Sequence, residues 1–399
     1  MTSYYSRLCS PRHLFEAWRR ISKSNKFSHG FDERSIKDFS DNLGEEILRL
    51  SRELREKTFT FTPARGVLAE KAGGKKRPIK VPAVRDRVVL TGIKELISPK
   101  FESFDLDCSF GYIKHRNVGD AIDTVMQLAN TGRKFILEAD IKSFFDTVDQ
   151  TLLMEMFTKE IRATSLRPLL EQAVRAEVGN LDSFTPYDRL MFPAPDSGIP
   201  QGGVLSPMLA NFYLYKFDSA MTNKGFRLVR YADDFVVMCS SNREAQDAYK
   251  LCLEILEGQL KLRMHHLDDT SGKTKITRYG DGFSFLGIKF DNGRVLPTEK
   301  VVDRFKEKIS SLTDPTQPST ILTSLFKLCN VVKGWGNAFK RYDTDQLFQD
   351  LDAFVRESLT TFLRHHEFYR GHHSLGKSQV RILGIPLLST LRSEGGWGR

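Results

Sequence analysis

An α+β fold is predicted for this chain of 399 residues, with an antiparallel sheet packed against helices and a helical C-terminal part. Two runs rich in β-branched and aromatic residues, 226–230 and 235–239, flank a short break, which is typical of a β-hairpin. An apolar strand pattern also covers residues 135–140, and residues 283–290 alternate like a strand. After Asp303 the pattern becomes helical. Strands in the middle of the chain and helices at its end together indicate this fold class.

Two adjacent carboxylates, Asp233 and Asp234, stand at the turn of the predicted hairpin. Asp is common in turns, so the pair alone is weak evidence for a site. The two charges repel each other, and a divalent cation with oxygen ligands, such as Mg²⁺, would explain their proximity. Asp140 ends the strand pattern and can point at the same tip. Asp140 and Asp233 would then hold two Mg²⁺ ions roughly 3.5–4 Å apart, with Asp234 as the supporting ligand.

Two further acids lie close to Asp140 in the sequence and are not expected to bind metal. Glu138 is interpreted as a strand residue that faces the other way. Asp146 is interpreted as a turn or cap residue ahead of a helix that starts near Asp149.

Residues 139–146, Ala-Asp-Ile-Lys-Ser-Phe-Phe-Asp, together with Tyr-Ala-Asp-Asp at 231–234, resemble the palm of a reverse transcriptase. The closest resemblance is to the bacterial class related to group II intron reverse transcriptases. Between these segments, residues 198–207 read Gly-Ile-Pro-Gln-Gly-Gly-Val-Leu-Ser-Pro, similar to the family motif that lines the nucleotide pocket. The resemblance implies a right-hand polymerase fold with fingers, palm and thumb. It also implies an RNA-directed DNA polymerase that adds dNTPs to a primer 3′-hydroxyl.

The resemblance divides the chain into subdomains. Residues 1–60 would form an N-terminal helical extension and residues 61–135 the fingers. The palm would cover residues 136–298, with a finger-like helical insertion at 150–195. Residues 299–399 would form the helical thumb and a C-terminal tail.

The resemblance also implies a set of metal-binding and nucleotide-binding residues. Phe145 would be the aromatic ring that excludes a 2′-hydroxyl, although either it or Phe144 belongs to the core. Lys273 would lie near the leaving pyrophosphate as a proton donor, or else it is an ordinary surface lysine. The backbone carbonyl of Ile141 would be a further metal ligand. The other nucleotide contacts would be Lys71, Arg77, Gln201 and Gly202, where glycine permits a close approach of the backbone.

Charge indicates a polyanionic partner. The net charge is +10, and residues 61–90 carry eight basic and two acidic residues around a predicted Gly-Gly turn at 73–74. The resemblance implies that RNA template and DNA product contact the residues Lys75, Lys76, Arg116, Phe285, Gly287 and Trp335.

The cysteines and the apolar segments of the sequence indicate the cellular location of the protein. Five dispersed cysteines are typical of a reducing compartment, and residues 1–7 show no apolar targeting segment. No apolar run approaches the roughly 20 residues of a membrane helix. We therefore expect a cytoplasmic bacterial protein with no membrane partner.

Three functions compete at this stage. The first, which we favour from the sequence, is a free-standing reverse transcriptase that copies a structured noncoding RNA encoded nearby, in antiphage defence. The second is a group II intron maturase and mobility enzyme. The third is an RNA-binding protein with a vestigial polymerase site, against which the intact Asp140, Asp233, Asp234, Gln201 and Phe145 argue. Mg²⁺ is the expected cofactor, with Mn²⁺ as a substitute, and the oligomeric state is not predicted.

Overall fold

The computed structural model describes residues 3–70, 74, 76–270, 272–317 and 320–391. The chain divides into two compact units, residues 1–276 and residues 277–399. Each unit contains its own cluster of buried apolar side chains.

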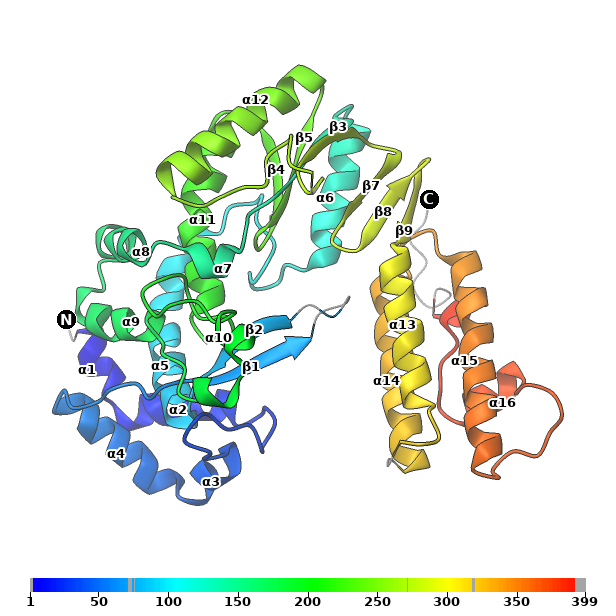
Figure 1. The fold of residues 1–399 in the computed structure, drawn as a ribbon, viewed down its shortest axis with the longest axis horizontal. Coiled ribbons are helices and arrows are strands. Elements are labelled where there is room, and N and C mark those ends of the chain that lie inside the picture. The colour runs from blue at the N-terminus through cyan, green and yellow to red at the C-terminus, as the bar shows by residue number, and fades with distance from the viewer. Residues whose placement is uncertain (1–2, 71–73, 75, 271, 318–319, 392–399) are drawn as a thin grey trace. The chain divides into compact units, whose positions relative to one another are not determined.

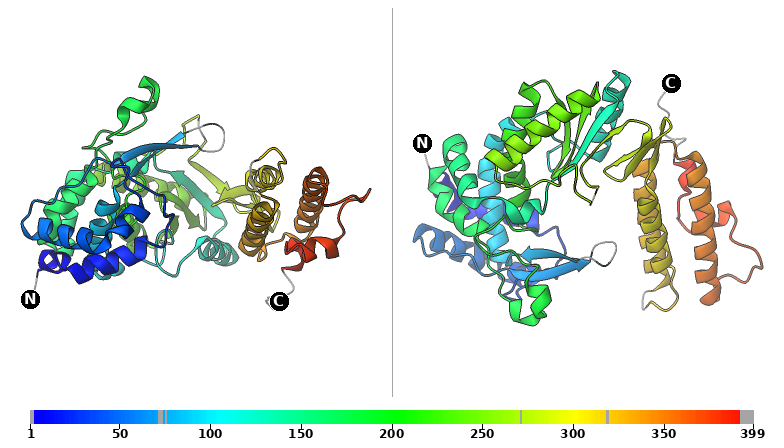
Figure 2. Two further views of the ribbon diagram at one scale, coloured as in Figure 1. Left: turned by 90° about the horizontal axis from the view of Figure 1, so that it is seen from below. Right: turned by 45° about the horizontal axis from the view of Figure 1, so that its top comes forward.

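The first unit begins with four helices, drawn in blue in Figure 2; α1, α2 and α3 pack against the long helix α5, and α4 packs against α2 and α3. Their bounds are α1 (Tyr4–Leu8), α2 (Pro11–Ile21), α3 (Ile36–Asp41), α4 (Leu43–Arg55) and α5 (Val84–Phe101). The apolar faces of these amphipathic helices supply much of the core, with Leu14, Trp18 and Leu50 almost completely buried. The hairpin of β1 (Arg65–Glu70) and β2 (Lys76–Val81) leads into α5.

A four-stranded sheet forms the centre of the first unit, with strand order β4-β5-β3-β6 (Figure 1). Its strands are β3 (Phe135–Asp140), β4 (Arg227–Tyr231), β5 (Asp234–Cys239) and β6 (Lys275–Arg278). The helices α6 (Val118–Asn130), α11 (Ser206–Asn223) and α12 (Asn242–Leu253) pack against it, and a π-helical turn (Glu254–Gln259) extends α12. Val229, Val236 and Val237 are fully buried, which explains the apolar runs on both sides of the turn.

Short helices connect β3 to α11. They are α7 (Phe144–Thr147), α8 (Gln150–Met156), α9 (Arg167–Val174) and α10 (Pro186–Arg189). A π-helical turn (Phe157–Ile161) and two 3-10 turns (Thr164–Leu166, Leu181–Ser183) lie between them, and a separate 3-10 turn (Glu102–Phe104) follows α5. The connection returns to the first strand of the hairpin, because Ala64 and Val178 form a parallel bridge.

The second unit contains a small sheet and helices. The strands β7 (Asp281–Phe285), β8 (Ile288–Asp291) and β9 (Arg294–Pro297) form an antiparallel meander. The helices are α13 (Glu299–Leu312), α14 (Ile321–Phe339), α15 (Asp345–His365) and α16 (Lys377–Ile382), followed by a 3-10 turn (Leu388–Thr390). Phe305, Leu328, Val355 and Leu359 lie in the core of this unit.

The α+β fold class and the hairpin around residues 231–234 are confirmed. The helix α11, with proline in its first turn, follows the loop that contains Gln201 and Gly202. The subdomain bounds implied by the resemblance stay predictions. The two compact units meet between Ile276 and Thr277. The strands β7–β9 pair only with each other among the described strands, and they lie in the unit that contains α13–α16.

Candidate active site

The predicted acidic tip is a tight hairpin turn next to Asp140. Tyr231 pairs with Asp234 across β4 and β5, which leaves Ala232 and Asp233 as the two turn residues. Ala232 has a φ of 58°, the left-handed conformation that such turns require. Across the next strand pair, Asp140 is the direct partner of Asp234. The register of β3 with β5 therefore places the first carboxylate beside the other two.

The three carboxylates crowd one another. Burial, followed by the charges of Asp233, Asp140 and Glu138, raises the pKa of Asp234 to about 6. Asp234 nevertheless keeps an exposed surface. Because an exposed carboxylate is well solvated, the neighbouring negative charges contribute more than burial to the raised pKa of Asp234. A cation at this tip would relieve their repulsion.

A lysine from outside the sheet lies against Asp140. The Lys273 ammonium donates to Asp140 Oδ2 at 2.7 Å, and its Nζ lies 3.2 Å from His265 Nε2. The backbone N–H of His265 donates to the carbonyl of Asp140 at 3.0 Å. Lys273 therefore lies next to Asp140, a predicted metal ligand, and its role near the pyrophosphate stays a prediction. His265 was not predicted, because a single histidine in a loop carries no signal in the sequence.

The interpretation of Glu138 was wrong. Alternate residues of a strand share a face, so Glu138 and Asp140 point to the same side of β3. The Lys275 ammonium lies 3.3 Å from Glu138 Oε2, and Glu138 contributes to the raised pKa of Asp234. Glu138 thus adds negative charge behind the tip.

Phe145 and the Gln201-Gly202 loop lie together beside β2. Phe144 is buried and Phe145 is partly exposed, so one ring belongs to the core, as predicted. They lie on the one-turn helix α7, however, and not on a strand. Gln201 Nε2 donates to Asp146 Oδ1 at 3.1 Å, and the N–H of Ile199 donates to the carbonyl of Phe145 at 2.7 Å. These bonds fix the loop against the residue expected to select the sugar.

Gly202 is required where it stands. Its φ is 93°, and a Cβ there would lie 2.7 Å from the Ile79 side chain. The carbonyl of Gln201 accepts a hydrogen bond from the N–H of Lys80 at 2.8 Å. The loop therefore packs directly on β2 of the β1–β2 hairpin.

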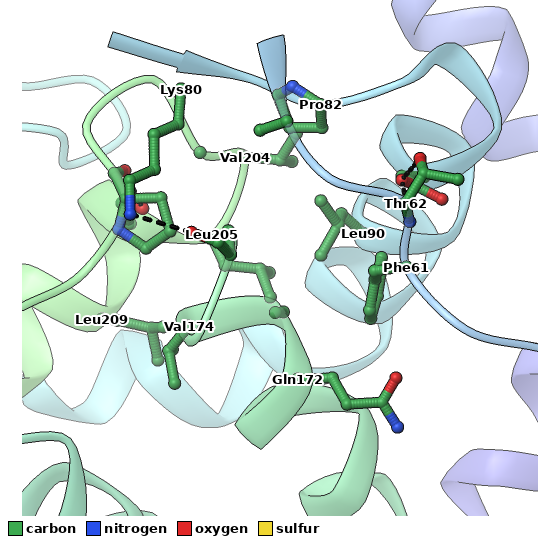
Figure 3. A pocket seen from close by; sticks show the side chains of 17 residues that line it. Phe61, Thr62, Lys80, Pro82, Leu90, Gln172, Val174, Val204, Leu205 and Leu209 are labelled. Atoms are coloured by element: carbon green, nitrogen blue, oxygen red, sulfur yellow. Dashed lines mark hydrogen bonds between the residues drawn. The ribbon is translucent and has the colours of Figure 1, made fainter. Parts of the chain in front are cut away.

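Behind that loop is a cavity of about 40 Å³, lined by Lys80, Val204, Leu205 and Leu209 among others (Figure 3). Lys80 is buried, and its ammonium donates to the carbonyl of Ala176 at 2.8 Å. Burial lowers the pKa of Lys80. The cavity has room for only a few water molecules, so the residues that line it serve to hold the loop in place.

Of the predicted fingers residues, Arg77 lies close enough to Tyr112 for its charge to act on that side chain. Asp233 raises the pKa of Tyr112 after burial, whereas Arg77 lowers it, so both charges act on the same phenol. Lys76 bonds to Asp188 of α10 at 2.8 Å. Lys71 and Lys75 lie outside the described residues, and their contacts with phosphate stay predictions.

Arg116 has a local structural role. Its Nη1 donates to the carbonyls of Leu106 and Ser109, both at 2.6 Å. Those bonds close the loop that leads to Phe110 and Gly111. A contact between Arg116 and nucleic acid stays a prediction.

In the second unit, the predicted nucleic-acid residues are structural. Phe285 is 5% exposed on β7, and Gly287 has a φ of 80° in the turn to β8. The Trp335 ring packs on Phe305 and Phe339, with centroids 4.7 and 4.6 Å away. Trp335 thus packs from α14 against the core of the second unit. Direct contacts of these three residues with nucleic acid stay predictions.

A family model decides the assignment. The model described as reverse transcriptase (RNA-dependent DNA polymerase) matches residues 69–290, which include every carboxylate of the tip. The chain belongs to the reverse transcriptase family. This reverse transcriptase has the right-hand polymerase fold and is an RNA-directed DNA polymerase. A second model, the group II intron maturase-specific domain, matches residues 302–373 within the helical unit.

Relatives of this reverse transcriptase confirm the predicted class. Protein YkfC of Escherichia coli K12 is 32% identical over 70% of this chain and 80% of its own length. The group II intron-encoded protein LtrA of Lactococcus lactis is 26% identical over 80% of this chain, which spans only 56% of that relative. A structure of apo telomerase from Candida tropicalis superposes with a TM-score of 0.45 at 12% identity, covering 77% of this chain and 57% of that one. At that level it adds nothing to the assignment.

The carboxylates of the tip fit a hard divalent cation. Their oxygen donors are those that Mg²⁺ prefers, and together with burial the charges of Asp233 and Asp140 help to raise the pKa of Asp234. Within the described part of the chain, no group of three or more His, Cys, Asp or Glu residues is gathered tightly enough to hold a metal ion as it stands. Lys273 instead supplies the positive charge at Asp140. No helix of the described residues is long and apolar enough to cross a bilayer.

Proposed function

We propose that this reverse transcriptase polymerises DNA with two Mg²⁺ ions, for which Mn²⁺ can substitute. Asp140, Asp233 and Asp234 would hold the ions, together with the backbone carbonyl of Ile141. When bound, the ions would lower the pKa of the primer 3′-hydroxyl and neutralise charge on the leaving pyrophosphate. The observation that carries the proposal is the direct pairing of Asp140 with Asp234 beside a tight turn that presents Asp233.

The other site residues would select and orient the dNTP. Arg77 offers a guanidinium fork that pairs with phosphate oxygens, and it acts on the same phenol as Asp233. Phe145 presents a partly exposed ring beside the loop of Gln201 and Gly202, where it would exclude a 2′-hydroxyl. Lys273 is hydrogen-bonded to Asp140, and its ammonium would donate a proton to the departing pyrophosphate.

We further propose that the template is a structured RNA encoded next to the gene, with complementary DNA as the product. The net charge of +10 suits an RNA backbone held largely by shape. The match of residues 302–373 to the maturase-specific domain favours intron RNA as that partner. The antiphage role with a dedicated noncoding RNA is the other candidate, and it stays a prediction. All five cysteines are unpaired, which supports a cytoplasmic location.

The partner RNA can be identified directly. The protein would be expressed with its native flanking DNA, purified, and the bound nucleic acid sequenced, beside an Asp233→Asn/Asp234→Asn control. Intron RNA from the same locus, with complementary DNA absent from the control, would support the maturase candidate. A flanking noncoding RNA that is not an intron, copied in the same metal-site-dependent way, would support the defence candidate. Mixed RNA without locus-specific DNA would refute the dedicated template.

A further inference from the structure

A fully buried arginine lies directly before the acidic turn. Arg230 is 1% exposed, on β4, one residue ahead of Tyr231. Its guanidinium binds Asp218 of α11 through one edge: Nε donates to Asp218 Oδ1 at 2.7 Å and Nη2 donates to Asp218 Oδ2. Asp218 is 0% exposed. The ion pair is thus removed from water on both sides.

The remaining side of the guanidinium bonds to the turn itself. Nη1 of Arg230 donates to the carbonyl of Ala232 at 2.8 Å and to Asn211 Oδ1 at 3.1 Å. Ala232 is the left-handed turn residue, a conformation that side chains with a Cβ adopt reluctantly. The bond to its carbonyl therefore stabilises the one backbone conformation on which the positions of Asp233 and Asp234 depend.

Asn211 extends the contact to the other side of the turn. Its Nδ2 donates to the carbonyl of Gly111 at 2.8 Å. A Cβ on Gly111 would lie 2.3 Å from the backbone nitrogen of Ala232, so only glycine permits this packing. The backbone of Arg230 also exchanges bonds with Cys108 and Phe110, at 2.7 and 2.8 Å. The turn is thus clamped between α11 and the loop 108–111.

Stability alone is a poor explanation for such a pair. Removing two charges from water is costly, and well-packed apolar residues of similar volume are often as stable or more so. What an apolar pair cannot supply is the donor to the Ala232 carbonyl. The specific consequence of the network is therefore the geometry of the turn.

We propose that Arg230, Asp218 and Asn211 form a positioning network that sets the spacing of the Asp233 and Asp234 carboxylates for metal binding. None of the three is placed to contact substrate, because Arg230 and Asp218 are buried and Asn211 acts through Gly111. Partners behind a metal ligand commonly change metal affinity or activity by about 10- to 100-fold. This inference rests on the proposed two-metal function.

The test compares the double variant Arg230→Met/Asp218→Leu with wild type and with Tyr213→Phe. The double variant removes both charges together, so it leaves no buried ion unpaired. Tyr213→Phe deletes another buried hydrogen bond of α11, from its hydroxyl to the carbonyl of Leu260 at 2.6 Å, away from the turn. Folding is monitored by circular dichroism and the melting temperature. Metal binding is measured without substrate, by luminescence titration with Tb³⁺.

The double variant is expected to fold and to bind Tb³⁺ about 10- to 100-fold more weakly, while Tyr213→Phe binds as wild type. Its kcat should fall with little change in the KM for dNTP. Adding Ala232→Gly should recover part of the Tb³⁺ affinity, because glycine adopts a positive φ without support. A folded double variant with wild-type Tb³⁺ affinity would overturn the inference. So would an equal loss in Tyr213→Phe.

If the double variant fails to fold, Arg230→Lys takes its place. Lysine keeps the charge beside Asp218 but lacks the planar fork that reaches two further acceptors. It should weaken Tb³⁺ binding, and unchanged binding would refute the inference. Failure of the proposed function is distinguishable, since wild type itself would then show no metal-dependent polymerisation.

Discussion

The Lys273 ammonium lies 2.7 Å from Oδ2 of Asp140, the residue directly opposite Asp234 in the ladder of β3 and β5. Lys273 also lowers the pKa of Asp234 against the other charges of the tip. A cation of the chain thus neutralises part of the acidic tip before any metal arrives. The relationship makes Lys273 both a competitor of the metal and a candidate proton donor.

Lys273→Met should therefore separate these two effects. Without the ammonium, Tb³⁺ should bind a few-fold more tightly, with a lower titration midpoint, because Lys273 no longer competes for the Asp140 carboxylate. The polymerisation rate at saturating Mg²⁺ should fall by about 10²- to 10⁴-fold if Lys273 is the general acid. Lys275→Met, at the Glu138 pair, is the matched control and should leave the rate nearly unchanged. A weaker affinity for Tb³⁺ in Lys273→Met would contradict the competition.

The raised pKa of Asp234, about 6, predicts a pH dependence of stability in the metal-free protein. The folded protein binds this proton more tightly than the unfolded chain, so protonation stabilises the fold. That stabilisation is complete below the unfolded pKa and is lost as the pH rises through about 6. In a chelator, Asp234→Asn should raise the melting temperature at pH 7.5 and leave it nearly unchanged at pH 4.

The control for that experiment is Asp196→Asn, on an exposed loop. It should shift neither melting temperature by a comparable amount. If Asp234→Asn raised the melting temperature more at pH 4 than at pH 7.5, the result would contradict a raised pKa of Asp234. In wild type, metal affinity should also weaken as the pH falls below about 6, since the bound carboxylate must be ionised.

Phe145→Ala should admit ribonucleotides. Its ring is partly exposed beside the Gln201 loop, whereas the ring of Phe144 is buried. Steric selection of this kind is typically worth about 10- to 200-fold, so preference for dNTP over rNTP should fall within that range. Single-nucleotide incorporation on a fixed template measures it. Phe144→Ala should instead destabilise the protein by about 3–5 kcal/mol. Unaltered selectivity between dNTP and rNTP in Phe145→Ala would refute the role of Phe145 in excluding the 2′-hydroxyl.

Variants of Trp335 distinguish a role in core packing from direct contact with nucleic acid. Its ring packs on Phe305, Phe339 and Phe348, so Trp335→Ala should cost about 3–5 kcal/mol and expose the second unit to proteolysis. Trp335→Phe retains an aromatic ring and should keep most RNA affinity in a filter-binding assay. A folded Trp335→Phe variant with strongly reduced RNA affinity would show that the indole contacts nucleic acid directly.

Local chemistry made part of the site predictable from the sequence. Asp233 and Asp234 lie at a break between two apolar strands, and Asp140 ends a third, so their positions follow from strand periodicity and turn chemistry. Pro207 in the first turn of α11 and the left-handed Gly202 follow from the backbone preferences of those two residues.

The rest depends on contacts between distant segments. Arg230 finds Asp218 only when α11 packs on β4, and His265 reaches Asp140 across 125 positions of chain, a separation given by 265 − 140. Neither residue has a distinctive local pattern. The error at Glu138 had a different cause, because the two-residue period of a strand already places it on the face of Asp140. The boundary after Ile276 depends on strand pairing, which the alternation of residues 283–290 leaves open.

The most direct test of the central claim is primer extension on a defined RNA template with dNTPs and Mg²⁺, comparing wild type with Asp233→Asn. Wild type should synthesise complementary DNA, and the variant should lose more than about 100-fold in rate, because even partners behind metal ligands cost about 10- to 100-fold. Both proteins should show the same melting temperature within a few degrees. Equal DNA synthesis by the folded variant, or synthesis by wild type that persists in a chelator, would contradict the assignment of the carboxylate tip as the metal-dependent catalytic centre.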